Sequence, residues 1–137
     1  MRDSLYLSAR SALLWPLRLL RPESRPETAS VKKILVLCPE KLGESVLALS
    51  FLKNLRALFP QAAITLFAGP FIEQLLSDEF YRLTPSQNPD AALNLQPDSC
   101  DLAVDLHCGP ELDTAKLCAA TNARWRAGLD IAGRGYL

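Results

Sequence analysis

The stretch "VLCPEKLGESVLAL" (residues 36–49) joins one apolar run to another through a short turn that contains Pro39 and Gly43. Upstream, "KKILVLC" (32–38) is short, apolar and partly β-branched, which is typical of a strand buried on both faces of a parallel sheet. Downstream, residues 43–59 predict a helix that ends at Pro60. The quoted stretch therefore predicts a strand, a tight turn and a helix.

The predicted helix carries apolar residues at spacings of three and four, so one of its faces is expected to pack on the sheet. We expect that inward face to consist of Leu47, Phe51, Leu55 and Leu58. The residues expected to face water are Lys53, Asn54 and Arg56.

Further along the chain, apolar runs and turn residues continue to alternate. The pattern predicts a strand at 62–69, a helix at 70–78 with Pro70 in its first turn, a proline-dotted loop at 84–100, a strand at 100–107, a helix at 111–120 and a strand or sheet edge at 123–129. Strands that alternate with helices indicate a three-layer, Rossmann-like α/β domain with a parallel sheet and right-handed crossovers. We expect this domain to span residues 31–137.

Residues 1–30 differ in composition from the rest and form an amphipathic leader and linker, with arginines but no lysine around a Leu/Trp-rich stretch. The apolar stretch is shorter than the roughly 20 residues needed to span a bilayer. Three interpretations stay open: an anchor on the inner leaflet of a membrane, a targeting peptide, and a helix packed on the domain or a frayed tail.

Composition excludes several classes of function. The formal net charge is zero, with 15 basic and 15 acidic residues, so nucleic acid is not an expected partner. Four cysteines without a CxxC pair and a single histidine predict reduced thiols in the cytoplasm and no metal site. Neither a G-x-G-x-x-G fingerprint nor a phosphate-binding P-loop is present, and no cofactor is expected.

Two segments follow the carboxyl ends of predicted strands, which is where open α/β sheets bind ligands. In the first segment, 39–45, Gly43 either makes a tight turn or lets a ligand approach closely. Glu44 either complements the helix macrodipole, by about 0.3–1 kcal/mol, or acts as a general base. In the second segment, 105–109, Asp105 and His107 either hold a substrate hydroxyl or hydrogen-bond the adjoining loop.

Three further residues have two possible interpretations each. Arg124 and Arg126 either contact phosphate or sugar acids or mark an edge strand. Cys38 closes a strand, and we expect it to pack in the core rather than act as a nucleophile, because the chain has no second histidine to activate it.

The sequence "KKILVLCPEKLGESVLALSFLKNLRALFPQAAITLFAGP" (32–70) resembles the opening of the ADP-heptose:lipopolysaccharide heptosyltransferase family, glycosyltransferase family nine. Members of that family begin with a strand, a short turn, a Gly-Asp pair, an apolar helix that ends near Phe-Pro, and a second strand. "CDLAVDLHCG" (100–109) and "ARWRAGLDIAGRGYL" (123–137) are similar to two later segments of the family. The resemblance covers about residues 32–137.

The resemblance implies a GT-B glycosyltransferase that moves a heptose, with inversion, from an ADP-sugar to a lipopolysaccharide-core or lipid-linked sugar acceptor. The N-terminal domain of such an enzyme holds the acceptor, and Glu44 stands at the place of the family's proposed base. Lys41, Gly43, Ser45, Asp105 and His107 are then expected to bind substrate.

The resemblance also implies that the donor domain is missing, so we expect the chain to be inactive alone and to be either a truncated form or one that works with a separately encoded second half. The expected location is the cytoplasm, at the inner-membrane surface if the leader is an anchor. The alternative is a non-catalytic α/β binding module or partner subunit.

Overall fold

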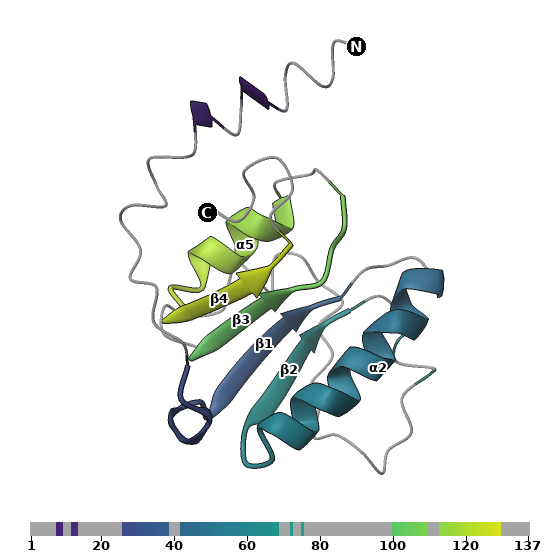
Figure 1. Ribbon diagram of the computed structural model, residues 1–137, viewed down its shortest axis with the longest axis vertical. Coiled ribbons are helices and arrows are strands. Elements are labelled where there is room, and N and C mark those ends of the chain that lie inside the picture. Colours follow the sequence, from purple (N-terminus) through teal and green to yellow (C-terminus); the bar gives the residue numbers. More distant parts are fainter. Residues whose placement is uncertain are drawn as a thin grey trace.

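The computed structural model describes residues 8–9, 12–13, 26–38, 42–68, 72, 75, 100–109 and 113–129. After a 3-10 turn η2 (Thr28–Ser30), these residues form the strands β1 (Lys33–Leu37), β2 (Ala63–Phe67), β3 (Leu102–Asp105) and β4 (Trp125–Gly128), and the helices α2 (Leu42–Leu58) and α5 (Asp113–Ala120). Every strand pairing is parallel and the strand order is β2-β1-β3-β4, which makes the fold α/β as predicted (Figure 1). Most of the predicted leader, helix 70–78 and loop 84–100 lies outside the described residues.

Strand β1 lies in the middle of the sheet because its side chains are apolar on both faces. Ile34, Leu35, Val36 and Leu37 are all buried. β1 pairs with β2 on one side, where Leu37 lies opposite Phe67, and with β3 on the other, where Leu37 lies opposite Asp105. A strand of this composition is stable only when both of its faces are covered.

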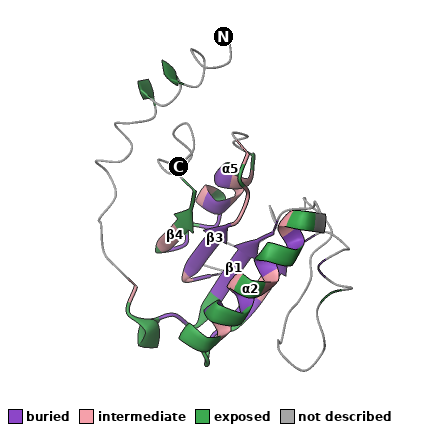
Figure 2. Ribbon diagram, turned by 45° about the vertical axis from the view of Figure 1, so that its right-hand side comes forward, coloured by how far each residue is buried: buried purple, intermediate pink, exposed green. Residues whose placement is uncertain are grey.

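The two helices cover opposite faces of the sheet, so the described residues form three layers (Figures 1 and 2). On the α2 face, Ile34 and Val36 join Leu52, Leu55 and other side chains in a large apolar cluster. On the α5 face, Leu35 and Leu37 join a smaller cluster that consists otherwise of Cys100, Ala103, Cys118 and Ala123. Because side chains alternate along a strand, successive residues of β1 point to opposite faces of the sheet and pack against different helices.

The inward face of α2 agrees with the expected one only in part: Leu55 is buried and Phe51 is half-buried against the larger cluster, as expected. Leu52 is 0% exposed, whereas Leu47 is 73% exposed and Leu58 is also exposed. The buried face consists of Ser45, Ala48, Leu52 and Leu55, and continues into Phe59 beyond the helix. This stripe and the expected one both fit helical spacing and share Leu55, so the periodicity did not separate them.

Side-chain contacts and one special backbone conformation lie at the ends of helices and strands. Arg56 was expected to face water, but it is half-buried and its Nη1 donates to the carbonyl of Ala62 at 2.8 Å, beyond the end of α2. At the same end of the sheet, where β1 begins, Asp101 Oδ2 accepts from the backbone N–H groups of Lys32 and Lys33, both at 2.8 Å. Asn122, with φ of 51°, adopts the left-handed conformation just after α5, which asparagine tolerates well.

The burial of α2 predicts that replacing leucine by alanine lowers the free energy of unfolding at Leu52 but not at Leu47. Leu52→Ala should lower the free energy of unfolding by about 2–5 kcal/mol, because it leaves a cavity in the larger cluster. Leu47→Ala should change it by less than about 0.5 kcal/mol, because Leu47 is exposed. Urea denaturation of both variants makes the comparison, and equal losses would contradict this orientation of the helix.

Candidate functional site at the carboxyl edge of the sheet

The parallel strands carry two of the predicted site segments to the same edge of the sheet. Asp105 ends β3 directly opposite Leu37 at the end of β1, and the backbone N–H of Leu106 donates to the Leu37 carbonyl at 3.0 Å. Helix α2 begins at this edge too, with Glu44 in its first turn (Figure 1). Ligand sites of open α/β sheets lie at this edge.

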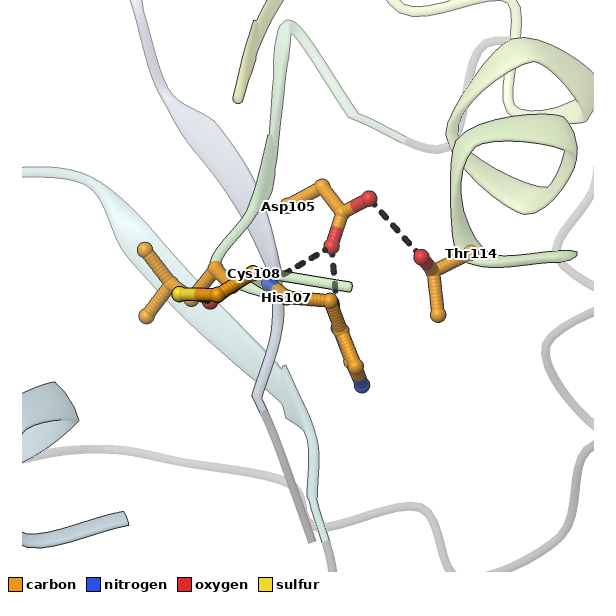
Figure 3. Close-up of polar contacts among 5 residues, drawn as sticks. Asp105, His107, Cys108 and Thr114 are labelled. Atoms are coloured by element: carbon orange, nitrogen blue, oxygen red, sulfur yellow. Dashed lines mark hydrogen bonds and ion pairs between the residues drawn. The ribbon is translucent and has the colours of Figure 1, made fainter. Parts of the chain in front are cut away.

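Asp105 is the centre of a hydrogen-bonded cluster (Figure 3). Its Oδ1 accepts from the backbone N–H of His107 at 3.0 Å and lies 2.9 Å from His107 Nδ1. Its Oδ2 accepts from Thr114 Oγ1 at 2.8 Å. Because Asp105 is only 7% exposed, these protein donors replace the water that an ionised carboxylate would otherwise need.

His107 and Asp105 thus meet as two side chains of one turn. The side chain of His107 is 25% exposed, and Figure 3 shows the far end of its ring pointing away from Asp105. The contact of a carboxylate with the backbone N–H two residues later is typical of an Asx-turn, which here ends β3. These contacts are hydrogen bonds within the turn after β3, as one of the two interpretations of the pair predicts.

Sequence reasoning missed Thr114. Thr114 lies in the first turn of α5, and its hydroxyl reaches back to Asp105 across the loop that joins β3 to the helix. One signal was present: the helix after a parallel strand starts at the carboxyl edge of the sheet, so a hydroxyl in its first turn is close to the end of the strand.

Three of the other predicted site residues lie at the start of α2. Gly43 and Glu44 lie in the first turn of α2, where Gly43 is exposed and Glu44 is half-buried. A side chain added at Gly43 would meet nothing within 4 Å, so there is open space beside this turn. Ser45 is fully buried, and Lys41 lies outside the described residues.

Strand β4 is an edge strand that packs closely against the site. Gly128 lies opposite Asp105, and a Cβ at Gly128 would lie 3.2 Å from the Asp105 carbonyl oxygen and 3.3 Å from its Cβ. At the other end of β4, the Arg124 guanidinium lies 4.5 Å from the centroid of the Trp125 ring. Burial lowers the pKa of Arg126, an effect that Cys118 partly opposes. Among the described residues β4 is the last strand on this side of the sheet, which agrees with the edge-strand interpretation of Arg124 and Arg126.

The cysteines form no disulfide, and three of them, Cys38, Cys100 and Cys118, are buried. Burial raises the pKa of the Cys38 thiol from 9.0 to about 12, so Cys38 stays protonated and packs in the core as predicted. Among the described residues, no group of three or more His, Cys, Asp or Glu side chains is placed to hold a metal ion.

Comparison with known proteins gives no relative: no family model, no curated protein and no solved structure matches the chain. Within the described residues, no helix combines the length and the apolar character that crossing a bilayer requires.

The burial of the cysteines predicts selective labelling. In the folded chain at mildly alkaline pH, a maleimide should modify Cys108, which is exposed, and leave the three buried cysteines intact. Mass spectrometry of the native and the denatured protein measures this selectivity. Cys108→Ser should abolish labelling of the native chain, and rapid native labelling of Cys38 would contradict its placement in the core.

The two glycines at the site predict opposite responses to an added methyl group. Gly128→Ala should destabilise the fold by about 1–3 kcal/mol, because the new Cβ crowds Asp105. Gly43→Ala should be neutral or should stabilise the fold by up to about 1 kcal/mol, because the Cβ enters open space on a helix. Urea denaturation measures both, and equal tolerance at the two positions would contradict the close packing of β4 on Asp105.

Proposed function

We propose that this chain is the acceptor-side domain of a glycosyltransferase of the heptosyltransferase type, and that it binds a sugar hydroxyl at the carboxyl edge of its sheet. The single observation that carries the proposal is the convergence of Asp105 and His107 with the first turn of α2 at that edge. Carboxylate and imidazole groups suit recognition of sugar hydroxyls, which both donate and accept hydrogen bonds, and the turn that carries Glu44 has open space beside Gly43.

The architecture supports the same proposal. The described residues form a parallel sheet with β1 between two neighbours and with a helix on each face, which is the arrangement expected for a Rossmann-like half of a GT-B enzyme. The residues at the edge also coincide with those that the sequence resemblance singled out, Glu44 after β1 and Asp105–His107 after β3. Fold and resemblance thus support the same location for the acceptor.

Within this proposal the acceptor is a lipopolysaccharide-core or lipid-linked sugar, and the donor is an ADP-sugar whose sugar is transferred with inversion. The open space beside Gly43 would let the acceptor approach the first turn of α2 without meeting a side chain at this position. Glu44 and His107 would then accept hydrogen bonds from its hydroxyl groups.

The proposal is tested by acceptor binding, which the chain as it stands can show. Isothermal titration of the full chain with core oligosaccharide should give saturable binding. Glu44→Gln and His107→Gln should each weaken it about tenfold, which corresponds to the loss of roughly 1.4 kcal/mol.

Glu27→Gln is the matched control, because Glu27 is exposed and precedes η2 at the opposite end of the sheet. This variant should bind as the unaltered chain does. Absence of any oligosaccharide binding would overturn the proposal and favour a non-catalytic binding module instead.

A further inference from the structure

The imidazole of His107 is held in one orientation because the backbone N–H and the ring Nδ1 of this residue both contact Asp105 Oδ1. Asp105 Oδ1 accepts from the His107 backbone N–H at 3.0 Å and lies 2.9 Å from the ring Nδ1. The backbone contact fixes where the side chain starts, and the ring contact fixes how the ring is turned. The orientation of the ring is therefore set by a single buried carboxylate.

That carboxylate is itself held from a second element. Thr114 Oγ1, in the first turn of α5, donates to Asp105 Oδ2 at 2.8 Å, so both oxygens of Asp105 are engaged (Figure 3). On the other side, Asp105 is paired with Gly128 of β4 in the parallel ladder. Three elements of the fold therefore position one ring, which is more support than an Asx-turn alone requires.

The contact with Asp105 favours one tautomer of the neutral ring. An ionised carboxylate only accepts hydrogen bonds, so it stabilises the form with the proton on Nδ1 and the lone pair on Nε2. Figure 3 shows this part of the ring directed away from Asp105. With 25% of the side chain exposed, the ring is accessible at the carboxyl edge of the sheet.

From this geometry we propose that His107 is the general base that accepts the proton of the acceptor hydroxyl, with Asp105 and Thr114 as its positioning residues. The inference rests on the function proposed above, because that function supplies the substrate, a sugar hydroxyl. It assigns to His107 the role that the resemblance gives to Glu44, which then acts as a binding group. Imidazole is the side chain used most often for such proton transfers.

The oxygen of the acceptor hydroxyl attacks the anomeric carbon of the donor sugar while its proton moves to Nε2 of His107. The bond between that carbon and the phosphate oxygen breaks, and the nucleoside diphosphate leaves with the electron pair. The imidazolium that forms keeps its Nδ1–H on the Asp105 carboxylate, which stabilises the positive charge, and later releases the Nε2 proton to solvent.

The chain is well suited to a direct test because it contains a single histidine, so every imidazole signal in its spectrum belongs to His107. Long-range ¹H–¹⁵N correlation spectra of the labelled full chain, recorded where the ring is neutral, report which nitrogen is protonated. We expect Nδ1–H and an unprotonated Nε2. Addition of core oligosaccharide should shift the Nε2 signal and leave Nδ1 protonated.

Two substitutions at one position separate positioning from simple packing. Thr114→Val removes the hydroxyl while keeping the shape of the side chain, and it should reduce the Nδ1–H preference. Thr114→Ser keeps the hydroxyl and should retain the preference. A change of tautomer is a readout that a purely structural role of Thr114 would not produce.

The outcomes distinguish this inference from the proposed function. A predominant Nε2–H tautomer in the free chain would overturn the role of His107 whatever the chain binds. Oligosaccharide binding that shifts backbone amide signals but leaves Nε2 unchanged would also overturn it, while the proposed function would stand. Absence of any shift on addition of oligosaccharide would count against both.

Discussion

The parallel pairing of β1 with both of its neighbours is the constraint on which the rest of the structure depends. Because Ile34, Leu35, Val36 and Leu37 are apolar without alternation, β1 must be covered on both faces and flanked on both sides. Parallel pairing then brings the ends of β1 and β3 together at one edge. The polar cluster at Asp105 therefore owes its place to an apolar strand that contributes no polar side chain to it.

Burial gives Asp105 its organising effect. An exposed carboxylate would share its hydrogen bonds with water and would hold its neighbours weakly. At 7% exposure, Asp105 contacts groups from its own turn and from α5, and its Oδ1 lies 2.9 Å from the ring Nδ1 of His107. A buried acid and a partly exposed base thus form a pair in which one residue orients the other.

Much of the fold could be predicted from the sequence, because short apolar runs and the prolines and glycines between them are local signals. The strands at β1, β2, β3 and β4 and the helices α2 and α5 lie where these signals placed them. The inward face of α2 could be predicted only in part, since two stripes that share Leu55 satisfy the same spacing and only the position of the sheet decides between them. The contacts of Thr114 and Gly128 with Asp105 were missed for a related reason: they join different elements.

The order of the strands also bears on how the chain folds. β1, α2 and β2 are consecutive and form one crossover unit, whereas Asp101 next to β3 contacts Lys33 across a separation of 68 residues. Since the entropy cost of closing a loop grows with its length, the crossover unit is expected to form early and β3 to dock afterwards. Until β3 docks, Glu44 and Asp105 are not at a common edge, so the site cannot form before this step.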